Sequence, residues 1–453
     1  MAQEYSLSLT EAVRRVREQK LSPIELVDQS LARIDQSDST IRAWAAIDRA
    51  AAQRAAAELD REARQRRFRG PLHGVPVGIK DIFYTAGLRT EAGSKLLAGF
   101  IPDYDAEAVA RLRRAGAIVL GKLATAEFAF ADAPATRNPW NQEHTPGGSS
   151  SGSGAAVAAR MCYAAIGSQT IGSTIRPASY CGIVGMKPTF GLVSRYGMLP
   201  LAPSLDHVGI FARSVADAAA MLQAIAGQDP RDPASRTVAA GDYALSASQA
   251  ERPPRIAVMP KPFDDRADDE TQAAVADALG KLASGGAQVE AIEEPPGFTE
   301  IKPNAQVIMC AEASNVHRER FAEKKDFYGP KLREFLERGL NMQACEYIRA
   351  VEVQRRFRQE VDRVLASFDA ILTPATPSPA PAGIESTGDP SFNLPWSLSG
   401  HPVISLPCAL ATSGLPISIQ LTGATLEEGR LLTVARWCER IVCFDAMPPT
   451  VQP

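Results

Sequence analysis

The feature that most constrains the fold is an alternation, starting near residue 75, of short apolar runs broken by glycine with stretches of helical periodicity. The apolar runs predict strands at residues 75–83, 117–120 and 163–168, and the periodic stretches predict helices at residues 106–115 and 154–160. Strands separated by helices are typical of an α/β protein, in which helices cover the faces of a sheet. We therefore expect an α/β fold.

The second half of the chain continues this pattern, and one large sheet can absorb all of its strands. Apolar runs predict strands at 255–259, 370–373, 402–406 and 417–422. Amphipathic stretches predict helices between or after them at 214–227, 269–284 and 427–440.

Two regions lack this alternation and are expected to lie outside the sheet. Residues 1–70 are predicted to be an all-helical lead-in, because Ser8 and Ser22 each precede an amphipathic run and have a glutamate three residues later, as N-caps do. Residues 301–368 are charged and free of strand signals, which predicts a helical insertion lying over the sheet. The proline-rich segment 374–390 is expected to be an ordered surface loop.

Composition excludes several functions. Lys and Arg number 49 against 52 Asp and Glu, a net charge of −3 without long like-charge runs, so nucleic-acid binding is not expected. The polar N-terminus, Met1 to Tyr5, and the Arg160 that breaks the longest apolar stretch predict neither a signal peptide nor a membrane helix. Seven dispersed cysteines without paired spacing predict a reducing cytoplasm.

Three short motifs fail on inspection. Residues 116–122 fit G-x-x-x-x-G-K, but Leu123 stands where a P-loop needs Ser or Thr, and the middle residues resemble a buried strand. Residues 148–152 fit G-x-S-x-G, yet His207, His317 and His401 have no recognisable triad context. The five histidines include no H-E-x-x-H or other paired spacing, so we expect no metal and no cofactor.

Three segments carry the chemistry: Gly74–Asp81 with Lys80 after an apolar run, Thr145–Gly154 with four serines, and Gly167–Pro177. A Gly/Ser run is commonly a flexible linker, and a lysine after a strand is commonly a charged strand end. The linker interpretation is weak here, because Gly147–Gly154 runs directly into the helix-forming Ala155–Ala159. The serines are therefore predicted to lie at a helix N-terminus.

In their order and content these segments resemble the amidase signature family. The similarity runs from about 74 to 217 and returns in 392–407 and 415–432. The resemblance implies a single α/β/α domain over residues 1–453 with a large mixed sheet, comprising a helical lead-in (1–70), the signature core (74–217), a helical insertion (301–368) and a return to the sheet (369–453).

The resemblance also implies a Ser-cisSer-Lys triad: Ser173 as nucleophile, Ser149 after a cis peptide as the proton relay, and Lys80 as base. Lysine acts as a base only when neutral, and lowering its pKa from about 10.4 to about 7 requires roughly 4.6 kcal/mol from burial and neighbouring groups. The apolar run before Lys80 agrees with burial. Asp81 would point to the opposite face of the strand.

Supporting residues follow from the same match. The main-chain amides of Thr170, Ile171, Gly172 and Ser173 would form the oxyanion hole. We expect Ser150 to hydrogen-bond the lysine or the relay beside Gly148, and Ser151 and Ser153 to cap or pack.

The chain also departs from the commoner pattern, Asp-Thr-Gly-Gly-Ser, in having Gln169, Ile171 and an arginine one residue later. The side chain of Ile171 would narrow the pocket and disallow glycine-like backbone angles. Gln169 and the Ser173-x-x-Arg176 spacing resemble the malonamidase-type branch, in which the arginine holds a substrate carboxylate. A structural ion pair is the alternative for Arg176.

The expected function is an amidase that hydrolyses a small-molecule carboxamide to a carboxylate and ammonia through an acyl-serine. The alternative is the amidase-family subunit of a glutamine-dependent aminoacyl-tRNA amidotransferase, which residues 191–197 and 204–206 resemble and which works only in a complex. A non-catalytic binding protein of the same fold disagrees with the complete triad. The acyl pocket is expected to include Asn304, Tyr328 and Trp396, although core packing is the alternative for Trp396. A homodimer is the default oligomer.

Overall fold

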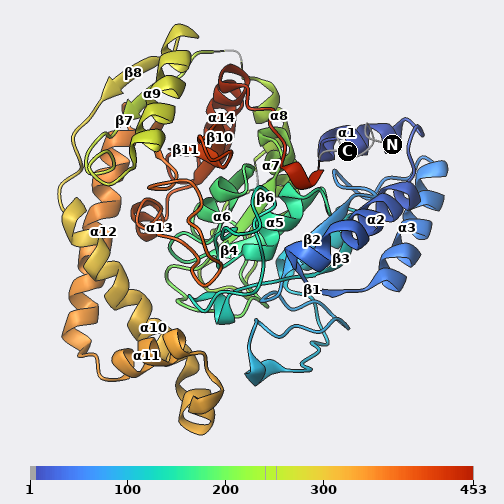
Figure 1. Cartoon of the computed structure of the whole chain (residues 1–453), viewed down its shortest axis with the longest axis horizontal. Helices are drawn as coiled ribbons and strands as arrows, with labels where there is room; N and C mark the ends of the chain where they lie inside the picture. Colours follow the sequence, from blue (N-terminus) through green and yellow to red (C-terminus); the bar gives the residue numbers. More distant parts are fainter. Residues whose placement is uncertain (1–6, 240, 251, 452–453) are drawn as a thin grey trace.

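The structure is a computed structural model that describes residues 7–239, 241–250 and 252–451. Within these residues eleven strands form one sheet, in the order β1-β3-β2-β4-β6-β5-β10-β11-β9-β7-β8 (Figure 1). The strands are β1 (Trp44–Ile47), β2 (Pro76–Lys80), β3 (Ile118–Leu123), β4 (Ala164–Gln169), β5 (Val184–Lys187), β6 (His207–Ala212), β7 (Arg255–Val258), β8 (Gln288–Ala291), β9 (Ala370–Pro374), β10 (Val403–Leu410) and β11 (Pro416–Thr422).

The sheet is mixed. β2 lies between parallel neighbours β3 and β4, and β7 lies between parallel neighbours β8 and β9. The strands from β4 through β6, β5, β10 and β11 to β9 pair antiparallel and join the two parallel parts. The expected α/β fold with a large mixed sheet is confirmed. That residues 1–453 are one domain stays a prediction.

Fourteen helices accompany the sheet in the described residues. They are α1 (Leu9–Arg17), α2 (Pro23–Ile41), α3 (Arg49–Arg64), α4 (Glu107–Arg114), α5 (Ser151–Ala158), α6 (Ile175–Tyr180), α7 (Val215–Ile225), α8 (Tyr243–Ser248), α9 (Asp269–Ser284), α10 (Ile301–Lys324), α11 (Pro330–Leu340), α12 (Ala344–Leu365), α13 (Leu394–Ser399) and α14 (Glu428–Val442). In Figure 1, α10 and α12 form one flank of the molecule and α1 to α3 lie on the opposite flank. None of the helices in the described ranges is long and apolar enough to cross a membrane.

The lead-in is helical with one exception. Ser8 and Ser22 cap α1 and α2 as predicted, and Ser22 forms a complete capping box with Glu25. However, residues 44–47 form β1, which pairs antiparallel with β3 at the edge of the sheet. An edge strand of four half-exposed residues has too short a pattern to be recognised in the sequence. Residues 1–5 lie outside the described part of the chain.

Three other strands were absent from our expectations, for two reasons. β5 and β6 are fully buried but contain glycine together with Lys187 or His207, which dilute their apolar runs. β8 is an edge strand in which three of four residues are exposed. The other predicted strands and the helices at α4, α7, α9 and α14 are confirmed with boundary changes of a few residues.

The insertion is helical and strand-free, as predicted, and consists of α10, α11 and α12. Two carboxylates of the loop after β3 hold the start of α11 against the sheet domain. Glu127 Oε2 accepts from the amide of Gly329 at 2.7 Å, and Asp132 Oδ2 accepts from the amide of Leu332 at 3.0 Å. The N-terminal end of α11 is therefore fixed to the same loop that carries Phe130.

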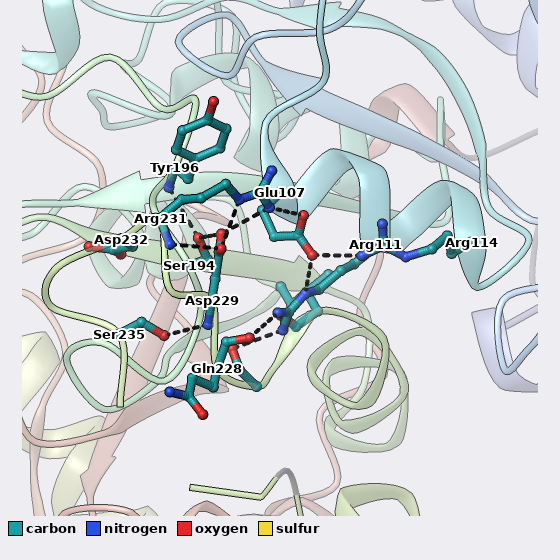
Figure 2. A network of polar contacts seen from close by, with 12 residues as sticks. Glu107, Arg111, Arg114, Ser194, Tyr196, Gln228, Asp229, Arg231, Asp232 and Ser235 are labelled. Atoms are coloured by element: carbon teal, nitrogen blue, oxygen red, sulfur yellow. Dashed lines mark hydrogen bonds and ion pairs between the residues drawn. The ribbon is translucent and has the colours of Figure 1, made fainter. Parts of the chain in front are cut away.

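A polar network fastens α4 to the loops after β5 and α7 (Figure 2). Glu107 accepts from Arg111 Nε at 2.7 Å, Arg114 Nη2 at 2.6 Å and Arg231 Nη2 at 2.5 Å. Asp229 accepts from Arg231 and from the hydroxyl of Ser194 at 2.6 Å. Ser194 belongs to the segment that resembles the amidotransferase subunit, and here it stabilises a loop.

Candidate active site

Lys80 is the last residue of β2, and its side chain is fully buried. Its Nζ donates to the hydroxyls of Ser149 and Ser168, each at 2.8 Å. Burial holds the pKa of Lys80 well below its usual range, and the charge of Asp206 opposes that shift. A lysine in this environment can accept a proton near neutral pH, as a general base must.

Asp81 does not hold Lys80 in the charged form. Its Oδ1 lies 3.5 Å from Nζ of Lys122, on the neighbouring strand β3, and its Oδ2 accepts from the amide of Glu91. Burial raises the pKa of Asp81 to about 6 and lowers the pKa of Lys122 to about 8. Lys122, the lysine of the P-loop-like motif, is thus a buried strand residue whose Nζ also donates to Phe83 O and to Thr90 Oγ1.

The serine-rich segment places Ser149 and Ser150 just before α5, as expected, and the peptide bond between Gly148 and Ser149 is cis. Ser149 contacts the lysine, but Ser150 does not. Instead Ser150 Oγ pairs with the main chain of Ser168, donating to its carbonyl at 3.1 Å and accepting from its amide at 3.2 Å. The expectation for Ser150 is therefore wrong: the second hydroxyl on the lysine belongs to Ser168.

Ser168 was missed because its segment, Ala164–Gln169, appeared only as a buried strand. β2 and β4 are parallel neighbours, so Lys80 and Ser168 both lie at carboxyl ends of strands, which meet at one edge of the sheet. Alternation along β4 then decides which side chain reaches the lysine. The pairing of β2 with β4 was the information that the sequence lacked.

Ser173 lies in the loop between β4 and α6, and its side chain is only 5 % exposed. Gln169 organises this loop: its Oε1 accepts from the amides of Thr174 at 2.9 Å and Ile175 at 3.0 Å, and its Nε2 donates to Ser397 Oγ at 2.9 Å. The hydroxyl of Ser173 forms no hydrogen bond within the described residues. The expected contact between Ser149 and Ser173 is thus not made here.

The main-chain N–H groups of Ile171, Gly172 and Ser173 also donate to no group in the described part of the chain. Ile171 has no positive φ, so it adopts an ordinary L-residue backbone, and its carbonyl accepts from Ser397 Oγ at 3.0 Å. At Gly172 a Cβ would lie 2.9 Å from Pro390 Cβ, so the close approach of that loop requires glycine. Free amides beside a buried serine suit a developing oxyanion.

Asp206 is a further buried group that sequence analysis missed. Its Oδ1 accepts from Thr170 Oγ1 at 2.7 Å, and its Oδ2 accepts from the amides of Leu201 and Ala202. Burial raises the pKa of Asp206 to about 6. Its charge acts on Lys80 and its hydrogen bond anchors the start of the Ser173 loop, so it links the base to the nucleophile's loop.

Ser173 opens into a pocket of about 320 Å³. Residues from three parts of the chain form it: the loop after β3, the segment 170–176 with Leu201, and the helical insertion with the proline-rich loop. The lining residues are Ala129, Phe130, Ala131, Thr170, Ile171, Ser173, Arg176, Leu201, Gln306, Met309, Phe335, Arg338, Thr387, Gly388 and Pro390. The insertion was expected to line the pocket, and through these residues it does.

Arg176 lines the pocket, but its guanidinium is engaged by the protein. Its Nη2 donates to Gly148 O at 2.6 Å, and its Nη1 donates to Gly388 O at 2.9 Å. Burial lowers its pKa to about 10. Arg176 therefore joins the serine-rich segment to the proline-rich loop, and neither a free fork for a substrate carboxylate nor a structural ion pair is present.

The other expected wall residues lie away from the pocket. Trp396 is fully buried and stacks on Phe263 with ring centroids 6.4 Å apart, so the core-packing alternative holds for it. Tyr328 is buried against His317, whose Nδ1 lies 3.1 Å from the tyrosine hydroxyl. Asn304 donates to Glu300 O within its own helix. In the described residues no group of three His, Cys, Asp or Glu is placed to hold a metal ion.

Comparisons with known proteins agree with this geometry. A family model described as "Amidase" matches residues 25–432. A curated relative from Anaeromyxobacter sp. (strain K), named as a subunit of glutamyl-tRNA(Gln) amidotransferase, is 38% identical over 98% of each chain. Peptide amidase from Stenotrophomonas maltophilia is 32% identical with a TM-score of 0.88 over 99% of each chain. The substrate complex of 6-aminohexanoate cyclic dimer hydrolase is 28% identical with a TM-score of 0.89, covering 99% of this chain and 100% of that chain.

Proposed function

The chain belongs to the amidase family, and from that membership we propose that it hydrolyses the carboxamide of a small molecule to a carboxylate and ammonia. The observation that carries the proposal is the fully buried Lys80, whose Nζ lies 2.8 Å from the hydroxyl of Ser149. A buried lysine with a depressed pKa and a serine partner is equipped to remove a proton from a hydroxyl nucleophile. We place the reaction in the cytoplasm as part of the same proposal.

The proposed reaction begins when Ser173 Oγ attacks the amide carbon. Ser149 takes the proton of Ser173 and passes its own proton to neutral Lys80. The unpartnered amides of Ile171, Gly172 and Ser173, with that of Thr170, stabilise the negative oxygen that forms. The lysine then returns the proton through Ser149 to the leaving nitrogen, the C–N bond breaks, and ammonia leaves an ester on Ser173.

Water completes the turnover. The same relay removes a proton from a water molecule that attacks the ester, and the acid is released with the Ser173 hydroxyl restored. In this structure the Ser173 hydroxyl has no protein partner among the described residues, so its contact with Ser149 would form with substrate bound. Hydrogen bonds at active sites are commonly long or absent before substrate binds.

The pocket supports a small acyl group without an ammonium. At about 320 Å³ it lies at the lower end of the 300–1,000 Å³ range of small-molecule sites. Its lining includes two arginines and no Asp or Glu. A zwitterionic amino acid such as glutamine brings an ammonium group, which is costly to bury without an acidic partner. The lining thus favours an amidase over a glutaminase.

A second candidate function is the amidase-family subunit of an aminoacyl-tRNA amidotransferase. Sequence relationship favours it: the curated relative named for that enzyme is 38% identical, more than the amidases of known structure at 28% and 32%. Both candidates share the first half of the reaction, release of ammonia from a carboxamide at Ser173. They differ in whether the ammonia is a product or is passed to a partner protein.

The test is ammonia release by the purified chain alone. The panel comprises glutamine, benzamide, hexanamide and malonamate, with Ser173→Ala as the blank and Ser153→Ala as a matched control. Ser153 is equally buried but donates only to Ile166 O, at 3.2 Å. We expect turnover of a small amide that is lost in Ser173→Ala and kept in Ser153→Ala.

Each other outcome has a definite meaning. Ammonia from glutamine alone would favour the amidotransferase subunit over the amidase. Turnover that survives Ser173→Ala would contradict the assignment of the nucleophile.

A further inference from the structure

The outer part of the Ser173 pocket is apolar and aromatic. Phe130, from the loop after β3, and Phe335, from α11, stack with ring centroids 4.5 Å apart and an interplanar angle of 31°. Met309 of α10 and Leu201 line the same space. A substrate that reaches Ser173 therefore passes an apolar section that favours hydrocarbon or an aromatic ring.

Arg338 is the outermost charged residue of the pocket. It is exposed, whereas Ser173 is 5 % exposed, so the two occupy the outer and deep ends of one cavity. Its guanidinium carbon lies 5.2 Å from the centroid of the Phe335 ring, a contact that favours one orientation of the arginine. The aromatic section and the charge are thus coupled through Phe335.

No carboxylate in the described part of the chain forms an ion pair with Arg338, unlike the other basic groups around α11. Arg333, one and a half turns earlier, lies 3.8 Å from Asp326, and Lys325 lies 2.6 Å from Glu337. The second arginine of the pocket, Arg176, is engaged by main-chain oxygens. Arg338 is therefore the cation that a bound anion would meet.

On the basis of the proposed function, we propose that the substrate carries a carboxylate separated from its reacting amide by an apolar, ring-sized segment, and that Arg338 binds that carboxylate. Guanidinium presents two parallel N–H groups to a carboxylate, which adds orientation to attraction. Because no acidic residue lines the pocket, such an anion meets no opposing charge there. Arg338 thus selects the substrate without taking part in the bond-breaking steps.

The experiment compares two probe amides that differ only in the distal charge, 4-carbamoylbenzoate and benzamide. The variants are Arg338→Gln and the control Arg333→Gln, which removes the same charge from the same helix outside the pocket. We expect the wild-type chain to favour 4-carbamoylbenzoate by about fivefold in kcat/KM, the upper range for an exposed ion pair. Arg338→Gln should abolish the preference through KM, leaving benzamide turnover unchanged, and Arg333→Gln should retain it.

A binding measurement keeps this proposal separate from the proposed function. Isothermal titration calorimetry of terephthalate and benzoate, which mimic the products, reports the charge preference of the pocket even if neither amide is turned over. Tighter binding of terephthalate that is lost only in Arg338→Gln supports the proposal, and so does a preference that weakens with added salt. Equal binding of the two acids, or an equal loss of both probes in Arg338→Gln, would overturn it.

Discussion

Removal of the Ser168 hydroxyl tests whether Lys80 is the base of the reaction. Ser168 Oγ accepts one of the two hydrogen bonds of Lys80 Nζ, at 2.8 Å, in a fully buried environment. A hydrogen bond to a charged donor contributes about 1.5–3 kcal/mol and one to a neutral donor about 0.5–1.5 kcal/mol, so the hydroxyl favours the ammonium form by about 1 kcal/mol. At 1.36 kcal/mol per pKa unit, Ser168→Ala should lower the pKa of Lys80 by roughly 0.7 unit.

The assay is the pH profile of kcat/KM, whose acidic limb reports the base of the free enzyme. Neutral Lys80 is the active form, so activity falls as pH drops through its pKa, and a lower pKa moves the limb to lower pH. We expect a shift of about 0.7 pH unit in Ser168→Ala. The plateau should also fall about tenfold, because the amine loses the partner that orients it.

Ser153→Ala is the matched control, since it removes a buried hydroxyl that bonds only to Ile166 O. Its acidic limb should coincide with that of the wild-type chain. A limb that stays in place in Ser168→Ala, or moves to higher pH, would refute the assignment of Lys80 as the titrating base.

Three further predictions concern groups around the site. Asp206→Asn removes a negative charge that raises the pKa of Lys80, so the same limb should move to lower pH in the kcat/KM profile. Gly172→Ala places a Cβ 2.9 Å from Pro390 Cβ and should lower kcat about tenfold without unfolding the chain, as steady-state kinetics and a thermal melt would show. Glu107→Gln removes the shared partner of three arginines and should cost about 2 kcal/mol of stability in urea unfolding, because two of those arginines are largely exposed and screened. An unchanged urea midpoint would contradict a stabilising role for that network.

How much of the fold could be predicted depended on the length and burial of each strand. β2, β3 and β4 have buried apolar runs, so their pattern identified them. β1 and β8 are four-residue edge strands, and β5 and β6 interrupt their apolar runs with glycine and buried Lys187 or His207. A buried polar residue in a strand depends on tertiary partners, as when Lys187 donates to His401 O at 2.5 Å, and local pattern carries no information about such partners.

The site divides in the same way. The segments that meet at the carboxyl ends of β2 and β4 have distinctive composition, so Lys80, Ser149 and Ser173 could be nominated from sequence. Ser168 needed the register of two parallel strands, and the engagement of Arg176 needed the position of the loop at Gly388. Trp396 and Tyr328 were chosen for residue type alone, and both are buried in the core.

These differences imply that chemistry and specificity are encoded in separate parts of the chain. The proposed base, relay and nucleophile come from strand ends and the turns that follow them, where burial and close approach leave few alternatives. The outer pocket comes from α10, α11 and loops, which are held to the sheet by contacts such as Glu127 with Gly329 rather than by the sheet itself. Substitutions in α11 can therefore change the acyl group without disturbing the relay, so shared sequence at 38% identity indicates the reaction better than it indicates the substrate.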